Sequence, residues 1–129
     1  MIFVDTNYFL RFLLDDNQEQ SKTVRTLLLK AAEGKVKIFT SVVVLFELYW
    51  VLSSYYGKNK DSVVEILRKI LDLGFIDFDQ RKIFVGALEL YGKTSLSLED
   101  CYNFHFARSR KAQGFVSFDA KLKKFWGQN

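Results

Sequence analysis

The chain has 129 residues and 49% of them are hydrophobic, which is enough for one domain with a sizeable core and too little for two, so we expect a single domain over residues 1–129. The chain has a single cysteine, which excludes an internal disulfide. It also has a single histidine, so a zinc site of the Cys/His type is excluded and any bound metal would have oxygen ligands. The formal net charge of +4 is compatible with a polyanionic partner but does not identify one.

The most apolar segment, residues 38–57, is long enough to raise the question of a membrane span. Glu47 interrupts its centre and serines dilute its ends, which favours a buried helix instead. No basic region leads an apolar stretch at the start of the chain, and Asp5 lies where a signal peptide would be uncharged. We therefore expect a soluble, cytoplasmic protein with no membrane contact.

The first predicted strand covers residues 2–4, an apolar run too short for a helix. Asp5 follows it, and helical spacing then begins at Thr6 and Asn7, either of which can cap the helix. Ligands of open parallel sheets bind at the carboxyl ends of the strands, so Asp5 is a candidate for chemistry. The alternative is that Asp5 only caps the helix.

The next elements predicted are a helix over residues 18–33 and a strand over residues 35–40. Thr40 and Ser41 then cap a third helix, which runs to Tyr56. Because this helix is apolar nearly all round, we expect it at the centre of the fold.

Glu47 is the only charged residue between Lys37 and Lys58. A carboxylate among apolar neighbours is costly to keep ionised, so Glu47 must face a cation, a metal or a water-filled cleft. The structural alternative is a buried ion pair with Arg11 or Arg25.

The pattern then predicts a helix over residues 61–73 capped by Asp61, a strand over residues 75–78, and a helix from Asp79 to about Tyr91. The acids of this region have capping or surface roles, and we assign no chemistry to them: Asp61, Asp72, Asp77 and Asp79.

A helix over about residues 98–112 follows Ser97, and the spacing of Ser97 and Asp100 is typical of a capping box. That role is the structural alternative for Asp100. Asp100 and Asn103 share one helical face, however, and Asp100 could point into the space that Asp5 faces.

A last apolar strand is predicted over residues 115–118. Asp119 follows it as Asp5 follows the first strand, although Asp119 could simply cap the terminal helix over residues 120–126.

Together Asp5, Glu47, Asp100 and Asp119 suggest one shared site. Four carboxylates in one cleft repel each other unless divalent cations neutralise them, and a set of oxygen ligands selects Mg²⁺ or Mn²⁺ over zinc. Such metals lower the pKa of water and stabilise the attacking and leaving oxygens of a phosphodiester. The implied reaction is hydrolysis of a phosphate ester.

Four segments occur along the chain in this order: Asp5-Thr6-Asn7 after the first strand, Glu47 in VLFELYWVL, Ser97-Leu98-Glu99-Asp100 before a helix, and Ser117-Phe118-Asp119 near the end. In order, spacing and length the whole chain resembles the PIN-domain family, and within it the single-domain toxin nucleases of the VapC type. Two departures are modest: Ser117 replaces the commoner threonine, and Asn103 stands where a histidine is frequent.

The resemblance implies an α/β fold, a three-layer α/β/α sandwich with a central parallel sheet, and a Mg²⁺-dependent endoribonuclease that acts as the toxin of a toxin-antitoxin pair, with Mn²⁺ as a substitute metal. By the same resemblance Asp5, Glu47, Asp100 and Asp119 bind the metal or organise the nucleophilic water. Thr6, Asn7 and Ser117 would orient them. It also implies a homodimer and a small antitoxin that occupies the cleft.

Two other functions stay open. A non-catalytic PIN-like module that binds RNA or protein would need one acid to be lost or unable to reach the cleft, and all four are present. A phosphotransferase with Asp5 as its covalent nucleophile usually has a second aspartate two residues on, where this chain has Asn7.

Overall fold

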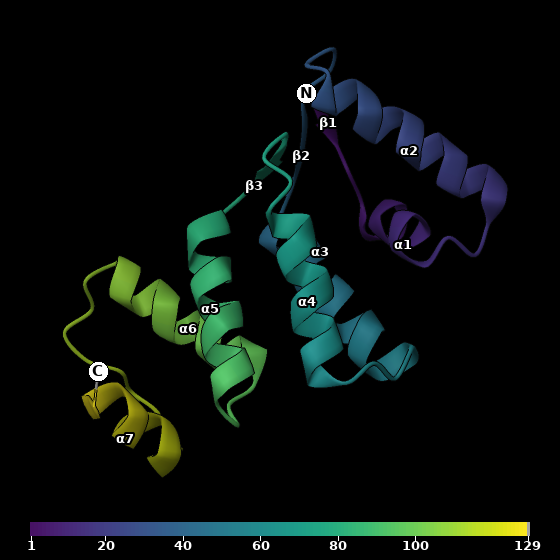
Figure 1. Cartoon of the computed structure of the whole chain (residues 1–129). Coiled ribbons are helices and arrows are strands. Elements are labelled where there is room, and N and C mark those ends of the chain that lie inside the picture. Colours follow the sequence, from purple (N-terminus) through teal and green to yellow (C-terminus); the bar gives the residue numbers. More distant parts are fainter. Residues whose placement is uncertain (129) are drawn as a thin grey trace. The chain divides into compact units, whose positions relative to one another are not determined.

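The computed structural model describes residues 1–128, and Asn129 lies outside the described part. The chain divides into two compact units, Met1–Arg81 and a second unit that begins at Lys82, and each is described by itself. All three strands belong to the first unit, and the second unit is helical (Figure 1). None of the helices within residues 1–128 is long and apolar enough to cross a membrane.

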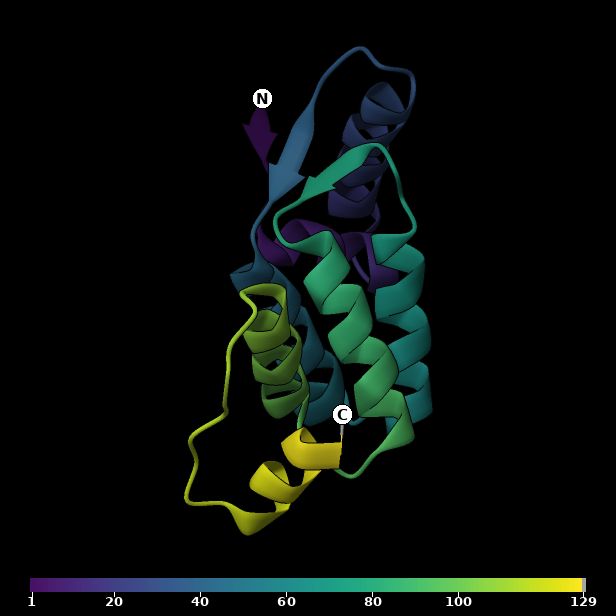
Figure 2. The same ribbon diagram turned by 90° about the vertical axis from the view of Figure 1, so that its left-hand side faces the viewer.

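The sheet of the first unit consists of β1 (Ile2–Phe3), β2 (Ile38–Thr40) and β3 (Ile76–Phe78), which lie side by side in that order (Figure 2). Both pairings are parallel, with Ile2 opposite Ile38 and Ile38 opposite Ile76. Three predicted strands are therefore confirmed in position, although each is shorter than predicted. The predicted α/β class with a parallel sheet is confirmed.

Helices alternate with these strands along the chain: α1 (Thr6–Leu14), α2 (Gln18–Ala32), α3 (Val42–Trp50) with its π-helical continuation η1 (Val51–Tyr55), and α4 (Lys60–Leu71). Helix α1 packs against α2 and α3, and α3 packs against α4. Phe9 of α1 is buried and stacks on Phe78 at the end of β3, with 6.1 Å between ring centroids. This apolar contact ties α1 to the sheet edge at which Asp5 lies.

Helix α3 is only partly buried. Leu45 and Leu48 are fully buried, whereas Val43 and Trp50 are 61% and 60% exposed. Val43, Glu47 and Trp50 are spaced by four and three residues, so they share one face of the helix, and this face is exposed. The expectation that apolar composition would bury the whole helix is wrong for this face, because only one side of α3 meets the core.

Helix α4 begins one residue earlier than predicted and has a different cap. The side chain of Asn59 accepts a hydrogen bond from the backbone N–H of Ser62 at 2.9 Å. The prediction that Asp61 caps this helix is therefore wrong. Asp61 lies in the first turn, where a carboxylate interacts favourably with the helix dipole.

The second unit contains most of α5 (Arg81–Lys93) together with α6 (Leu98–Ser109) and α7 (Ala120–Gln128). Its aromatic core centres on Phe104, whose ring lies 4.7 Å from that of Phe115 and 5.5 Å from that of Phe125. Helices α5 and α6 approach closely at Gly86, where a Cβ atom would lie 2.6 Å from Nδ1 of His105.

The predicted strand over residues 115–118 is wrong. These residues have no regular structure, and Val116 and Phe118 are fully exposed. A strand needs a neighbour that satisfies its backbone groups, and within the described residues every sheet pairing joins β1, β2 and β3. An apolar run without such a neighbour is not held in a sheet.

Candidate functional site

The carboxyl edge of the sheet, meaning the ends of β1, β2 and β3 and the one or two residues after each, is held together by three hydrogen bonds. The N–H of Val4 donates to the Phe39 carbonyl at 2.9 Å, and the buried Thr40 hydroxyl donates to the Val4 carbonyl at 2.7 Å. The N–H of Asp79 donates to the Thr40 carbonyl at 3.2 Å. The backbone positions of Asp5 and Asp79 are therefore fixed at one edge, as expected for parallel strands.

Asp5 occupies the N-cap position of α1, with an extended backbone (φ −84°, ψ 166°). The prediction that Thr6 or Asn7 caps this helix is therefore wrong. Asp5 is exposed, and its side chain makes no capping hydrogen bond. The carboxylate is thus not occupied by the helix, and the alternative that Asp5 only caps α1 is not supported.

Thr6 has an unusual environment beside Asp5. Thr6 is only 6% exposed, and its Oγ1 has no hydrogen-bond partner among residues 1–128. A buried hydroxyl without a partner costs about 1–3 kcal/mol. The residue after the free carboxylate of Asp5 thus carries an unpaired oxygen, the donor type that hard divalent cations bind.

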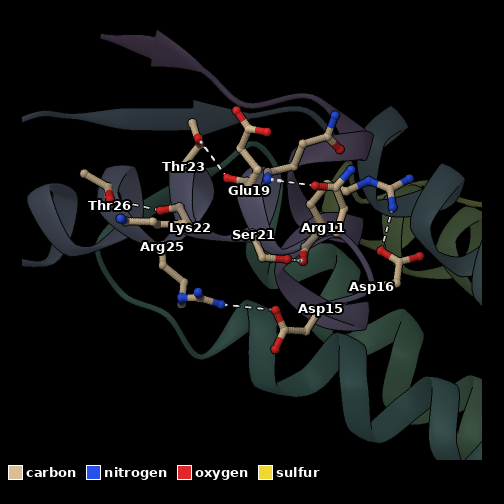
Figure 3. Close-up of polar contacts among 11 residues, drawn as sticks. Arg11, Asp15, Asp16, Glu19, Ser21, Lys22, Thr23, Arg25 and Thr26 are labelled. Atoms are coloured by element: carbon tan, nitrogen blue, oxygen red, sulfur yellow. Dashed lines mark hydrogen bonds and ion pairs between the residues drawn. The ribbon is translucent and has the colours of Figure 1, made fainter.

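Glu47 lies on the exposed face of α3, so its carboxylate is open to solvent and is not buried among the apolar residues that flank it in the sequence. The structural alternative is not supported either, because Arg11 pairs with Asp16 at 2.6 Å and Arg25 pairs with Asp15 at 3.2 Å (Figure 3). Glu47 is therefore accessible to a ligand.

In the second unit, Ser97 caps α6 as predicted, because its Oγ accepts the N–H of Asp100 at 3.1 Å. Asp100 itself is half-buried in the first turn of the helix.

Asp119 precedes α7, and its Oδ1 accepts the backbone N–H groups of Lys121 at 2.9 Å and Leu122 at 3.4 Å. The capping alternative for Asp119 is therefore confirmed. A carboxylate has about four acceptor sites, so capping leaves Asp119 able to bind a further ligand. The Ser117 hydroxyl accepts the N–H of Asp119 at 3.0 Å and so orients it.

The structure thus places Asp5 and Glu47 in the first unit and Asp100 and Asp119 in the second. Neither unit, within residues 1–128, contains a group of three or more His, Cys, Asp or Glu residues that could hold a metal. Convergence of the four acids on one site stays a prediction.

Asp79 was assigned no chemistry from the sequence, yet it is exposed at the same edge as Asp5. The signal was present, because Asp79 follows an apolar strand as Asp5 does. A capping role at the start of α5 explains that position in the sequence equally well.

His105 lies on α6 in contact distance of Gly86 and is half-buried. Burial has the largest effect and lowers the pKa of its imidazole. The neighbouring Glu89 carboxylate raises this pKa, and the Arg108 guanidinium lowers it further.

Residues 2–126 match the PIN domain family, so the chain belongs to that family. The family predicted from the four segments is therefore confirmed. The chain is also similar to a protein described as a VapC ribonuclease from Aquifex aeolicus (strain VF5), with 24% identity over 124 residues, 96% of this chain and 91% of that protein. No solved structure matches the chain significantly.

Proposed function

We propose that this chain is a metal-dependent endoribonuclease that acts as the toxin of a toxin-antitoxin pair. The observation that carries the proposal is the free carboxylate of Asp5 beside the unpartnered hydroxyl of Thr6, at the carboxyl edge of the sheet of a PIN-domain chain. Similarity to a protein described as a VapC ribonuclease supports RNA as the substrate and a small antitoxin as the partner.

In this proposal Asp5, Glu47, Asp100 and Asp119 hold Mg²⁺, with Mn²⁺ as a substitute. The donor set fits these ions, because it consists of oxygen atoms and excludes the sulfur and nitrogen ligands that favour zinc. When bound, the cation would offset the repulsion among the carboxylates and act as a Lewis acid toward the phosphodiester.

The remaining polar residues position these acids. Thr6 and Asn7 follow Asp5 directly and would orient its carboxylate and the attacking water. Ser117 already accepts the N–H of Asp119 and so limits the positions that its side chain can take. A homodimer and a cytoplasmic location complete the proposal.

The test is cleavage of a mixed pool of structured RNAs by the purified protein in Mg²⁺ or Mn²⁺. We expect Asp5→Asn to reduce cleavage by at least about a hundredfold, because it removes a metal ligand. Asparagine is as good an N-cap residue as aspartate, so folding should be unchanged. Asp61→Asn is the matched control, since Asp61 is an exposed acid in the first turn of a different helix.

Loss of cleavage with a chelator and in Asp5→Asn, but not in Asp61→Asn, would support the proposal. Equal cleavage by wild type and Asp5→Asn would contradict it. A folded wild type that binds RNA without cutting it would instead support the non-catalytic module.

A further inference from the structure

A cavity of about 220 Å³ lies between α1 and α2, next to the candidate site. Its lining comes from one face of each helix: Asn7, Tyr8 and Arg11 from α1, and Gln20, Thr23 and Val24 from α2. Asn7 is two residues from Asp5, a separation of at most about 7 Å along the chain. The wall of the cavity at Asn7 is therefore close to the backbone of Asp5.

The charge of the cavity argues against a phosphate ligand. Arg11 is the only ionised group in the lining, and its guanidinium already pairs with Asp16 at 2.6 Å, as Figure 3 shows. A buried phosphate needs cations that are not already neutralised. The cavity therefore favours a neutral polar ligand.

The polar groups of the lining match the edge of a nucleobase. The side-chain amides of Asn7 and Gln20 each offer donors and an acceptor. The Thr23 hydroxyl donates to the Glu19 carbonyl at 3.2 Å, which leaves its lone pairs for a ligand donor. Amides of this kind form paired hydrogen bonds with bases, and aromatic rings stack on them.

Tyr8 supplies the aromatic ring. It lines the cavity and is 40% exposed, so part of its ring is open to a stacking partner. The cavity is also smaller than the roughly 300–1,000 Å³ of sites for drug-sized ligands, which fits a single base.

We infer that the cavity between α1 and α2 binds one RNA base next to the scissile phosphate and thereby sets the base preference of cleavage. This inference rests on the proposed function and names the part of the chain that would choose the substrate sequence. Gln20 reads the edge of the base, and Tyr8 stacks on its face.

The first test measures binding without cleavage. Each of the four ribonucleosides is titrated separately into the protein in the presence of a chelator, and the side-chain amide signals are followed by NMR. We expect at least one nucleoside to shift the Gln20 amide saturably, and Gln20→Ala to weaken that binding about tenfold. Gln18→Ala is the matched control, because Gln18 is in the same helical turn and outside the lining.

The second test sequences the ends of the RNA fragments. We expect Gln20→Ala to lose about tenfold of the preference for one base beside the cut, whereas Gln18→Ala keeps the preference of the wild type. Unchanged preference in an active Gln20→Ala enzyme would overturn the inference and leave the proposed function intact.

Failure of the proposed function and failure of the inference about the cavity give different results. A wild type that cuts no RNA contradicts the proposed function, and the nucleoside titration still decides whether the cavity binds a base. If no nucleoside shifts the NMR signal of the Gln20 side-chain amide, the assignment of the cavity to RNA is overturned. The same holds if only a protein partner, and no nucleoside, shifts that signal.

Discussion

At the scale of one residue, Thr6 carries an unfavourable free-energy term in the folded protein. Its hydroxyl is buried and has no partner among the described residues, although buried polar groups in proteins almost always have one. A change that removed this hydroxyl would stabilise the free protein. Such costs persist where function needs the group.

We predict that Thr6→Val raises the free energy of unfolding by about 1 kcal/mol, because valine keeps the shape and removes the unpaired hydroxyl. The same variant should cut RNA at least about tenfold more slowly if Thr6 orients the site. Thermal unfolding and cleavage rates check both parts. Thr26→Val, at an exposed threonine of α2, should change neither, and unaltered cleavage by Thr6→Val would remove Thr6 from the site.

His105 gives a second prediction at this scale, because it is the only histidine of the chain. Burial is the main cause that lowers its pKa from the ordinary 6.5, while Glu89 raises the pKa and Arg108 lowers it further. The folded protein therefore binds the proton at lower pH than the unfolded chain. Above about pH 6.5 the imidazole is neutral in both states and has no effect on the pH dependence.

As the pH falls from about 6.5 toward the lower folded pKa, we predict that the free energy of unfolding decreases. Below the folded pKa this group causes no further loss. Urea unfolding at a series of pH values measures the effect, and His105→Asn should lack the decrease within that window. An imidazole NMR titration of the folded protein that gave a pKa of 6.5 or higher would refute the prediction.

At the scale of elements, helix caps could be predicted from the sequence where neighbouring residues alone determine them. Ser41 and Ser97 cap their helices as predicted, because a hydroxyl followed by a helical pattern bonds the first free N–H groups wherever the helix lies. Thr40, which was also predicted to cap α3, instead donates its hydroxyl to the Val4 carbonyl. The cap of α4 was predicted wrongly since Asn59 and Asp61 both have capping side chains and the sequence does not rank them.

Features that depend on distant partners could not be predicted in this way. Residues 115–118 have the composition of a strand, but a strand forms only beside another strand, and no local pattern supplies that partner. The π-helical continuation Val51–Tyr55 has the same apolar spacing as an α-helix, so the sequence does not separate the two.

The contact of α5 with α6 at Gly86 gives a prediction at this scale. Alanine there would place a Cβ atom 2.6 Å from Nδ1 and 2.7 Å from Cε1 of His105, so we predict that Gly86→Ala destabilises the protein by about 1–3 kcal/mol. In the background of His105→Ala the clash is absent, and the same change should stabilise α5 by about 1 kcal/mol because alanine favours a helix. Urea unfolding of the four proteins measures the cycle. Destabilisation of equal size in both backgrounds would show that His105 is not the obstacle.

At the scale of the whole molecule, the PIN family could be predicted from the order of four short segments along the chain, and the family match over residues 2–126 confirms that prediction. Convergence of Asp5, Glu47, Asp100 and Asp119 on one site stays a prediction, because the order of residues along a chain does not show whether distant side chains meet. The unpartnered hydroxyl of Thr6 and the place of Asp79 at the sheet edge also depend on tertiary structure, which the sequence pattern does not contain.

The most direct test of the account is Mn²⁺ binding by the wild type and by Asp5→Asn, Glu47→Gln, Asp100→Asn and Asp119→Asn, measured by water proton relaxation. If the four carboxylates share the metal, each substitution weakens binding by at least about tenfold, whereas Asp61→Asn binds as the wild type does. Thermal unfolding confirms that each variant is folded. Binding that depends on Asp5 and Glu47 but is unchanged in Asp100→Asn and Asp119→Asn would contradict the account, and so would a folded wild type that binds no Mn²⁺.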